Sequence, residues 1–582
     1  MPIDHHPRPR THTALLMVLL CLGTMACNDD GGDGTSADIN RDTGLDTLDD
    51  TTDTTPQEDS RSESDTRLED TEPTPSAQEQ LLAIEETGSV ELPGLEAEVQ
   101  VVYTEMGIPH IYAQSRRDLG YALGFVLARD RFFVMDLQRR LALGTLSAVL
   151  GDIALSNDIE ARLMGMAEVT DRIMDNLSEV DAAYMDAYAD GVNAYIAQVA
   201  DGALPAPSEL ETAGPLLGST NPVDLMQPFD RRSVAAMVAV IVYETNFESG
   251  DPGRELKADG LEELFPDAPF AELRQAGARK DIWDRLVPLF DVVSAPGFGI
   301  YNAGQQADRK PLRPYPLPEP NPQTLHNLRW TLPRPMLART TERLDAIRIR
   351  FGRRELDNFG SNTWAVQGTR TRDGASLVAG DGHLPLSVPS LMYQIGMDTR
   401  VFGDGDIAEA GLLITSLPVL AVGTNGSIAW SQVNPVSDIV DWYREVVVLD
   451  SEGVPTASMF QGEERPLIAI EEAYTIANVP ALGSEGRTET WTRWTTFDGR
   501  HLFDIEGLEI GPDDPIEPGQ RPTRFGDRII IPQDTDGDGL ITAISFDYTA
   551  FDLTRYVGTL VDFTRDQASG RFLVVEHGLT SG

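Results

Sequence analysis

The spacing of apolar residues is helical in the first half of the chain and strand-like in the second. Apolar positions at three- and four-residue intervals predict amphipathic helices, which cover residues 118–151, 179–199 and 231–243. Alternating or short apolar runs bounded by Gly and Asp predict strands, which cover residues 97–103, 364–366, 376–379, 411–414 and 442–449. A helical region followed by a strand-rich region is typical of a layered α+β protein.

Two stretches break this pattern. Residues 28–75 carry 16 Asp and Glu against three Arg and have no aromatic residue, so they cannot bury enough apolar surface to fold. Residues 296–336 are rich in proline, which forbids regular hydrogen-bonded structure and predicts an extended, exposed connector. The predicted segments are a signal at 1–27, a disordered acidic tether at 28–88, a helical region at 89–295, a Pro-rich spacer at 296–360 and a strand-rich region at 361–582.

The first 27 residues are typical of an export signal. Basic residues precede the apolar run Ala14–Leu22, which is too short to span a bilayer as a permanent helix. The pattern resembles a bacterial lipoprotein signal, in which Cys27 becomes the acylated first residue; ordinary signal cleavage nearby is the alternative. Both predict export to the periplasm or the outer surface of a bacterium. The other cysteine, Cys21, lies inside the run, so the exported body has no internal disulfide.

The composition limits the kinds of partner that the protein is expected to bind. The formal net charge of −47 excludes an electropositive nucleic-acid surface, so no nucleic acid is expected as a partner. Contact with a membrane is expected only through a lipid on Cys27. The motifs G-x-S-x-G, H-E-x-x-H and the P-loop, which mark common hydrolases and phosphate-binding proteins, do not occur in the sequence.

Two ordered sets of motifs stand on either side of the spacer. The first set is Gly107-Ile108-Pro109-His110-Ile111 and Ala128-Arg129-Asp130-Arg131-Phe132, and the second is Gly360-Ser361-Asn362-Thr363-Trp364, Asp381-Gly382-His383-Leu384 and Gly423-Thr424-Asn425-Gly426. In this order they resemble the penicillin-acylase family of N-terminal-nucleophile hydrolases over residues 90–560. The resemblance implies an αββα sandwich with a mainly helical first half. It also implies a precursor that cuts itself between Gly360 and Ser361 into an α/β heterodimer.

The chemistry explains why Ser361 must become a chain terminus. A serine hydroxyl needs a base to take its proton, and a free α-amine, with a pKa of about 7.7–8.0, can serve as that base. In the precursor this nitrogen is an amide and cannot act as a base. The resemblance implies that Ser361 attacks the carbonyl of Gly360 and thereby frees its own amine. The implied reaction is hydrolysis of a linear or cyclic small-molecule amide through an acyl-enzyme on Ser361.

Acyl transfer also requires hydrogen-bond donors for the oxyanion. The resemblance implies that these are the backbone N–H groups of His383 and Asn434, and the His383 side chain is expected to order the local loop rather than to act as a base. Pro435 has no N–H, which leaves Asn434 as the donor in its segment. The implied acyl pocket is apolar and suits an apolar acyl group. It consists of Phe247, Leu384 and Val422.

A cation site is implied shortly after the last of these motifs. The resemblance implies one structural Ca²⁺, held by the carboxylates of Asp438 and Asp441 and the carbonyl of Val440; a solvated acidic turn is the alternative. A third acidic ligand is expected from the helical half, with Glu244, Glu248 and Glu255 as candidates. A second acidic loop, residues 534–539, begins like an EF-hand, but Ser545 stands where a bidentate Glu is required. This loop is therefore expected to connect two strands.

Family members have a longer second half, which includes a downstream Asn whose side chain completes the oxyanion hole. This chain stops at Gly582, so its second half is expected to be C-terminally incomplete. The chain is then a fragment, one of two chains that together make the fold, or a degenerate homologue. The rival to the amidase is a non-catalytic surface lipoprotein that keeps the acylase scaffold.

Overall fold

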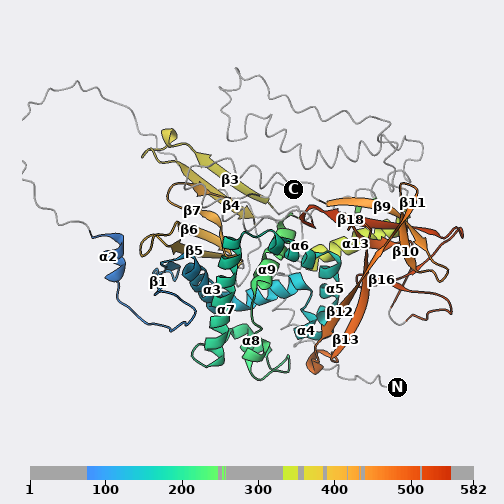
Figure 1. Ribbon diagram of the computed structural model, residues 1–582, viewed down its shortest axis with the longest axis horizontal. Helices are drawn as coiled ribbons and strands as arrows, with labels where there is room; N and C mark the ends of the chain where they lie inside the picture. Colours follow the sequence, from blue (N-terminus) through green and yellow to red (C-terminus); the bar gives the residue numbers. More distant parts are fainter. Residues whose placement is uncertain are drawn as a thin grey trace, which may run out of the picture. The chain divides into compact units, whose positions relative to one another are not determined.

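The computed structural model describes residues 75–246, 252–253, 256, 332–350, 360–383, 390–415, 417–431, 433, 440–511 and 514–551 (Figure 1). Its contacts divide the chain into two units, one of residues Ala26–Glu91 and one of the remaining residues. The described residues of the smaller unit form the short helix α2 (Ala77–Leu82), which begins with a capping box between Ser76 and Glu79. The sequence predicts disorder up to residue 88, and the capping box explains this local departure.

Three long helices form the helical layer of the larger unit. They are α3 (Arg116–Leu143), α7 (Glu179–Ala200) and α9 (Arg231–Asn246), and they confirm the helices predicted from apolar spacing. Helix α3 begins after Ser115, whose side chain accepts from the Asp118 N–H, and ends at Gly144 with a φ of 60°. The shorter helical elements nearby are α4 (Ser147–Leu150), η1 (Gly151–Ala154), α5 (Leu155–Leu163), α6 (Met166–Asp175), α8 (Ser208–Ala213) and η2 (Pro222–Leu225).

Helices α3 and α7 approach closely because glycines stand at their contact. A Cβ at Gly124 would lie 2.0 Å from the carbonyl oxygen of Tyr188, and a Cβ at Gly191 would lie 1.9 Å from that of Tyr121. Beside this contact, the side chains of Leu123 and Tyr188 are fully buried in the main hydrophobic core. The two glycines therefore set the distance between the helices.

The first sheet has six strands in the order β1-β2-β5-β6-β7-β8. They are β1 (Gln100–Tyr103), β2 (Pro109–Tyr112), β5 (Met392–Asp398), β6 (Ala408–Ile414), β7 (Leu420–Thr424) and β8 (Ala429–Trp430). Strand β2 pairs in parallel with β5, with His110 opposite Gly396, and the other pairs are antiparallel. This parallel pair joins strands from the two predicted halves of the chain in one sheet.

The second sheet has seven antiparallel strands in the order β11-β10-β9-β18-β14-β13-β12. They are β9 (Val440–Leu449), β10 (Pro455–Phe460), β11 (Glu463–Pro466), β12 (Ile468–Ile476), β13 (Arg487–Thr495), β14 (His501–Ile505) and β18 (Leu540–Tyr548). A smaller sheet, in the order β15-β17-β16, packs beside it. Its strands are β15 (Gly507–Ile510), β16 (Thr523–Phe525) and β17 (Arg528–Pro532).

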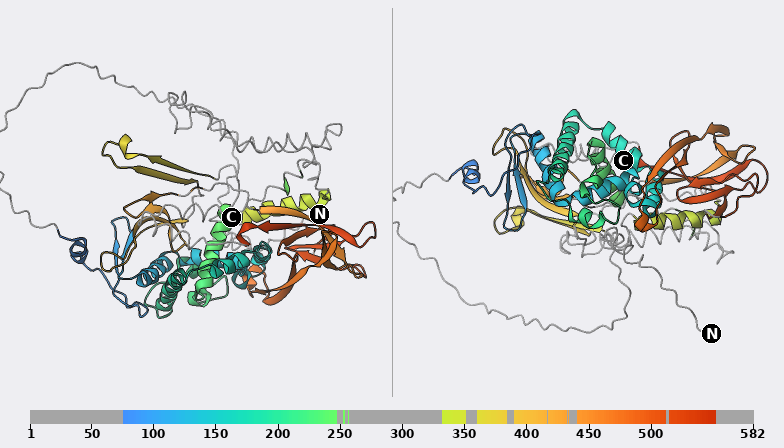
Figure 2. Two further views of the ribbon diagram at one scale, coloured as in Figure 1. Left: turned by 45° about the horizontal axis from the view of Figure 1, so that its top comes forward. Right: turned by 90° about the horizontal axis from the view of Figure 1, so that it is seen from below.

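Helices α3 to α9 lie between the two large sheets of the larger unit (Figures 1 and 2). One hydrophobic core runs through all three layers and includes Leu413 of the first sheet, Leu127 of α3 and Phe546 of the second sheet. A second, smaller cluster joins the seven-stranded and three-stranded sheets through Val447 and Ile530. The mixture of helices and sheets confirms the α+β class that the sequence predicts.

Helix α13 (Arg334–Arg350) lies within the range predicted to be a spacer. Pro335 falls in its first turn, where a proline removes no hydrogen bond. Farther along the helix, the side chains of Met336 and Leu344 are buried in the main core. The prolines of this region predict an extended chain up to residue 336, but the apolar residues that follow form a helix instead.

The predicted export signal, with Ala14–Leu22 and Cys27, lies outside the described residues and stays a prediction. Among the residues that the structure describes, no helix combines the length and the apolar character needed to cross a bilayer. The boundaries of the signal, tether and spacer likewise stay predictions, apart from the two helices reported above.

Candidate active site

The predicted cleavage site lies at the first residues of a two-stranded antiparallel sheet. Its strands are β3 (Gly360–Val366) and β4 (Leu377–His383). Gly360 pairs with His383, and Ser361 pairs with Gly382. The hairpin therefore brings together the predicted nucleophile, the residue before it and the backbone of the predicted donor His383. Ser361 itself is half-buried.

The face of the hairpin that carries Ser361 turns toward the first sheet. Side chains two residues apart in a strand share a face, and so do residues directly opposite each other in an antiparallel pair. The hydroxyl of Thr363, two residues after Ser361, donates to Oγ of Ser431 over 3.2 Å. Thr363 lies opposite Gly380, where a Cβ would meet Oγ of Ser431 at 1.9 Å and Cγ1 of Val422 at 3.8 Å. Ser361 thus shares its face with residues that contact β7 and the end of β8.

The motif from Gly423 to Trp430 builds the turn that places Ser431. The side-chain oxygen of Asn425 accepts from the N–H groups of Ser427 and Ile428, both over 3.0 Å. Gly426 has a φ of 83°, a left-handed conformation that favours glycine. Trp430 is buried and its ring nitrogen donates to the carbonyl oxygen of Leu420. The motif therefore forms a hydrogen-bonded β7–β8 turn that places Ser431 beside the hairpin.

The hairpin carries apolar side chains that the described residues leave exposed. Trp364 is 53% exposed and Leu377 is 56% exposed, and Val366 and Val378 are also exposed. An isolated two-stranded hairpin is marginally stable in water. Its contact with Ser431 and Val422 is therefore important for holding Ser361 in place.

Several predicted site residues lie outside the described residues, and their roles stay predictions. They are Phe247, Glu248, Glu255, Leu384, Asn434 and Asp438. Glu244 belongs to α9 and His383 to β4, but their side chains are not among those that the structure describes. Val422 is the one residue of the predicted acyl pocket that the described part of the chain includes, and it is half-buried in β7.

The described part of the predicted calcium segment is the start of β9. Val440 is buried, Asp441 is exposed, and Asp441 lies directly opposite Asp547 of β18. Burial raises the pKa of the nearby Tyr443, and the charges of Asp441 and Asp547 raise it further. Like charges directly opposite each other in a sheet are destabilising, and a pair of carboxylates is a donor set that fits a hard cation such as Ca²⁺.

The second acidic loop connects β17 to β18, as the sequence predicts. Oxygens of Asp534, Asp536 and Asp538 lie within 4.8 Å of one another. Asp534 already accepts from the N–H groups of Gly537 and Gly539, each over 2.8 Å. These backbone hydrogen bonds lower the pKa of Asp534. The loop is therefore organised by its own hydrogen bonds, which is sufficient to explain its sequence.

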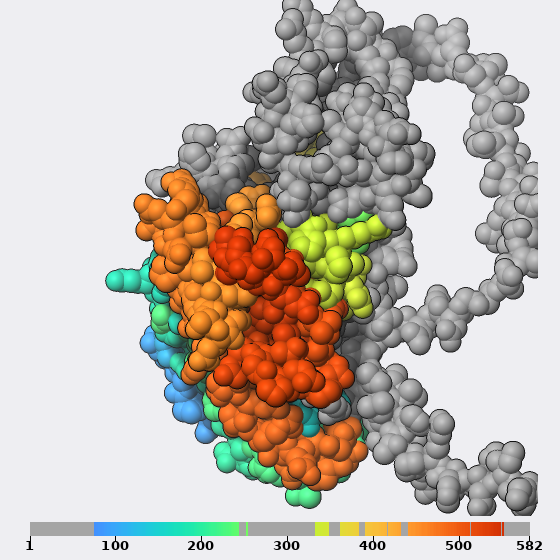
Figure 3. Space-filling model, turned by 90° about the vertical axis from the view of Figure 1, so that its right-hand side faces the viewer, coloured from blue at the N-terminus to red at the C-terminus, as the bar shows by residue number. Residues whose placement is uncertain are grey.

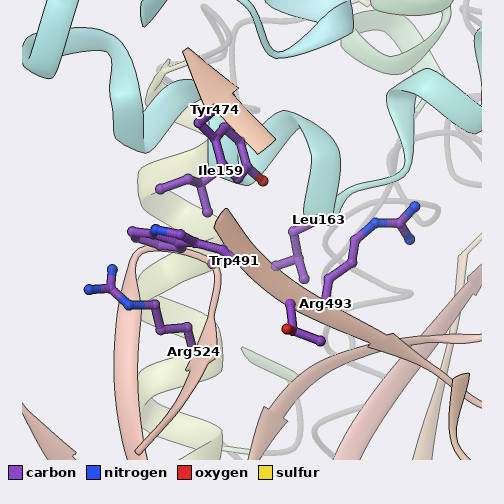
Figure 4. Close-up of a pocket in the computed structure, with 8 residues that line it drawn as sticks. Ile159, Leu163, Tyr474, Trp491, Arg493 and Arg524 are labelled. Atoms are coloured by element: carbon purple, nitrogen blue, oxygen red, sulfur yellow. The ribbon is translucent and has the colours of Figure 1, made fainter. Parts of the chain in front are cut away.

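A small pocket lies elsewhere, among α5, β12, β13 and the β16–β17 turn (Figure 4). Its lining includes Ile159, Leu163, Tyr474, Trp491, Arg493 and Arg524. The guanidinium of Arg524 stacks 3.7 Å from the centre of the Trp491 ring, and that of Arg493 forms ion pairs with Glu168 and Glu472. These contacts join β13 to α6, β12 and β16, and the pocket includes no residue predicted from the sequence to be functional.

Comparison with known proteins identifies the family. The family model described as penicillin amidase matches residues 98–512, which is well over half of the chain. The chain belongs to this family. The penicillin G acylase of Escherichia coli is 26% identical over 444 residues, and the match covers 70% of this chain and 46% of that protein. The acyl-homoserine lactone acylase QuiP of Pseudomonas fluorescens is 27% identical over 391 residues, covering 67% and 40%.

Other family members complete the comparison. The penicillin acylase 2 proenzyme of a Pseudomonas species is 28% identical over 378 residues, covering 64% of this chain and 41% of that protein. A solved chain of the thermostable penicillin G acylase from Alcaligenes faecalis is 26% identical and matches 32% of this chain and 91% of its own length, with a TM-score of 0.26. That score is too low for the superposition to support an argument. The chain spans less than half the length of the three curated relatives named here.

Sequence reasoning did not find the contact that orients the nucleophile strand. Thr363, Gly380 and Ser431 meet because β3, β4 and β8 approach one another in three dimensions. The available signal was the pair of glycines at 380 and 382, two residues apart in a strand. Glycines at such spacing leave one face of a strand without side chains and indicate the close approach of another backbone.

Proposed function

We propose that this chain is the precursor of an acylase that hydrolyses a small-molecule amide with an apolar acyl group. The observation that carries the proposal is the position of Ser361. It stands at the start of β3, beside the His383 backbone and on the face that meets β7 and β8. Membership of the penicillin amidase family supports the same reading. An αββα sandwich is part of this proposal.

The first reaction frees the nucleophile's own base. Oγ of Ser361 attacks the carbonyl carbon of Gly360, the carbon–oxygen bond forms, and the carbon–nitrogen bond between the two residues breaks. The nitrogen of Ser361 takes a proton and becomes an amine, while residue 360 is held as an ester on Oγ. Water then hydrolyses the ester, which leaves a carboxylate on Gly360 and the free hydroxyl of Ser361. Before this cut the nitrogen is an amide and cannot serve as a base.

The second reaction is turnover of the amide substrate. The freed α-amine takes the hydroxyl proton of Ser361 as Oγ attacks the substrate carbonyl, and the N–H groups of His383 and Asn434 stabilise the oxyanion. The proton passes to the leaving amine, and an acyl-enzyme remains on Ser361. Water, activated by the same amine, releases the acid. Val422, Phe247 and Leu384 would hold the acyl chain.

The substrate class follows from the pocket and from the relatives. Val422, Phe247 and Leu384 are apolar and lack a charge that would select a charged acyl chain. The relatives' names identify them as acylases of penicillins and of acyl-homoserine lactones. We therefore propose either a linear or a cyclic amide with an apolar acyl group as substrate.

Two further features belong to the same proposal. One Ca²⁺ would be held by Asp438, Asp441 and the carbonyl of Val440, and Asp547 adds a carboxylate opposite Asp441.

Export to the periplasm or the outer surface would be followed by acylation of Cys27, which anchors the body through its acidic tether. A palmitate analogue should then label the wild-type protein and leave Cys27→Ala unlabelled, and equal labelling of both would contradict the anchor.

The test of the central claim is the fate of the bond between Gly360 and Ser361. The full-length gene product should appear as two fragments by intact mass, and the second should begin Ser-Asn-Thr-Trp. Ser361→Ala should remain one chain, whereas Ser427→Ala, an exposed serine in the β7–β8 turn, should be cut as in the wild type. The cut protein should hydrolyse an apolar probe such as phenylacetyl p-nitroanilide faster than a succinyl p-nitroanilide. A different residue at the new terminus, or equal hydrolysis with Ala at 361, would refute the mechanism.

A further inference from the structure

Helix α13 lies where an extended, exposed spacer is expected, yet its packing is that of a core element. The side chains of Met336, Leu337, Leu344 and Ile347 are at most 3% exposed and belong to the main hydrophobic core. Figure 3 shows the helix, in yellow-green, directly against the orange and red strands of the second half of the chain. Removing these side chains would open a large apolar surface on both sides of the helix.

A buried ion pair fixes α13 to the first half of the chain. The side chain of Arg343 is 4% exposed and that of its partner Glu160, on α5, is 1% exposed. Nε of Arg343 donates to Oε1 of Glu160 over 3.0 Å and Nη2 donates to Oε2 over 2.9 Å. This is the two-bond arrangement in which an arginine and a carboxylate interact most strongly. Loss of either partner would break both charge-assisted hydrogen bonds of a buried pair, which is strongly destabilising.

The same guanidinium fixes α13 to the second half. Nη1 of Arg343 donates to the carbonyl oxygen of Phe503 over 2.8 Å, and the guanidinium carbon lies 4.3 Å from the centre of the Phe503 ring. Gly526 has a φ of 62°, and a Cβ there would lie 1.5 Å from Nη2 of Arg343. The turn at Gly526 therefore has room for the guanidinium only because the residue has no side chain.

A second arginine, one helical turn earlier, repeats this arrangement. Arg339 donates from Nε and Nη2 to the two carboxylate oxygens of Asp504, each over 3.2 Å. Its Nη2 also donates to the carbonyl oxygen of Ile505 over 3.0 Å. The side chain of Asp504 is 5% exposed. Both arginines thus pair with buried carboxylates.

We propose that α13 is a permanent clamp between the two chains of the mature protein and is not removed with any spacer. The proposal rests on the proposed cut at Ser361 for its chain assignment. After that cut, Arg339, Arg343 and Glu160 belong to the first chain, whereas Phe503 and Asp504 belong to the second. Any trimming of the spacer then falls before residue 332 or after residue 350, and Glu160 and Phe503 keep this helix as their partner.

The decisive experiment does not need the self-cleavage. In the full-length chain with Ser361→Ala, recognition sites for a specific protease replace residues within 318–325 and within 352–358. After both sites are cut in neutral buffer, the peptide that contains α13 should co-elute with the body in gel filtration and separate only in denaturant. Elution of the α13 peptide apart from the body under native conditions would overturn the proposal.

Variants identify the contacts that hold the α13 peptide on the body. Arg343→Met should release the peptide and lower the Tm by about 5 °C or more, because it removes the charge-assisted hydrogen bonds that Arg343 donates to the buried Glu160. Glu342→Gln on the same helix, with a side chain 76% exposed, should behave as the wild type. The double variant E160M/R343M buries no charge and should retain the peptide better than Arg343→Met. Equal release from the single and double variants would show that the ion pair is not what holds the helix.

The wild-type protein provides the second readout. If the chain cuts itself, mass spectrometry of the purified two-chain protein should find residues 332–350 at the same molar amount as the fragment that begins at Ser361. A two-chain protein without these residues would overturn the clamp and leave the cut intact. If the chain does not cut itself, the proposed function fails, and the experiment with added protease sites still decides whether α13 is held.

Discussion

At the scale of single residues, the orientation of Ser361 depends on a contact that Ser361 itself does not make. Gly380 of β4 touches Ser431, and Thr363 donates to the same hydroxyl. This contact is small, but it fixes the distance between the hairpin and the first sheet. A catalytic residue displaced by about 1 Å can lose about 100-fold in rate. Gly380, which lies opposite Thr363, is therefore expected to affect the rate of the cut at Ser361 without contacting the reacting atoms.

This expectation can be tested with a compensating pair. In Gly380→Ala the new methyl group would meet Oγ of Ser431 at 1.9 Å, so the hairpin must move, and the cut at Ser361 should slow by about 10- to 100-fold. Ser431→Gly removes the obstructing atoms, and the double variant should recover most of the wild-type rate. Gel analysis of the fraction cut against time measures all four proteins. If the double variant were as slow as Gly380→Ala, the contact would not be the cause.

A buried histidine gives the fold a pH dependence of known sign. His501 stacks on Phe551, and its Nδ1 lies 3.0 Å from the carbonyl oxygen of Leu163. Burial lowers its pKa from 6.5 to about 4, and the charge of Arg493 adds to the effect. Because the folded-state pKa is depressed, the stabilisation is present above pH 6.5 and is lost as the pH falls toward 4.

The expected contribution of His501 to this loss is about 3 kcal/mol of unfolding free energy between pH 6.5 and pH 4. His501→Gln cannot take up a proton, so its unfolding free energy should fall less over the same interval, although the variant is less stable at pH 7. Urea unfolding of both proteins at pH 7, 5.5 and 4 measures the difference. Parallel pH profiles for the two proteins would refute the assignment.

At the scale of elements, local patterns predict what a segment forms but not what it pairs with. The spacing of apolar residues predicts α3, α7 and α9 correctly, although α9 is buried at every position from Ser233 to Tyr243. The parallel pair of β2 with β5 places His110 opposite Gly396. The sequence of neither short segment predicts this pairing. Helix α13 was missed because the prolines before it dominate the local pattern, whereas its helix is stabilised by burial and by ion pairs with distant residues.

The crossing of α3 and α7 offers a prediction at this scale. In Gly191→Ala the new methyl group would lie 1.9 Å from the carbonyl oxygen of Tyr121, which is backbone and cannot move aside. Overpacking of this kind costs about 3 kcal/mol and exceeds the roughly 1 kcal/mol that alanine gains over glycine within a helix. Chemical denaturation should show a net loss of about 2 kcal/mol. Gly88→Ala, where a Cβ meets nothing within 4 Å, is the control, and equal stability of both variants would contradict the account.

At the scale of the whole molecule, the helical and strand-rich halves predicted from the sequence do not form separate layers. The first sheet combines β1 and β2 with strands that follow Ser361, and one core includes side chains from both halves. A cut before Ser361 should therefore leave two chains that remain associated. The sequence identifies Ser361, Gly360 and His383 as neighbours through a family motif, but the face on which Ser361 lies follows only from the packing of β4 on β8.

A cation is expected to have its largest effect on stability at the link between the two large sheets. Strand β8 of the first sheet ends at Trp430 and β9 of the second begins at Val440, so the nine residues between them, which include Asp438, carry the chain from one sheet to the other. At the end of this link, Asp441 lies opposite Asp547. A cation between or beside two opposed carboxylates offsets their mutual repulsion. A bound Ca²⁺ should therefore stabilise the fold as a whole rather than one loop.

The prediction is that chelation lowers the melting temperature of the wild-type protein by about 5 °C and that added Ca²⁺, but not Mg²⁺, restores it. A ligand at about 100 times its Kd stabilises the folded state by about 2.7 kcal/mol, which sets the expected size of the shift. Asp441→Asn should melt at the same temperature with and without chelator, because the site has lost a charged ligand. Asp536→Asn, in the acidic loop before β18, should keep the wild-type response and so exclude that loop as the source. If chelator left the wild-type melting curve unchanged, or if Asp441→Asn responded as fully as the wild type, Asp441 would be a solvated carboxylate at a strand end and not a calcium ligand.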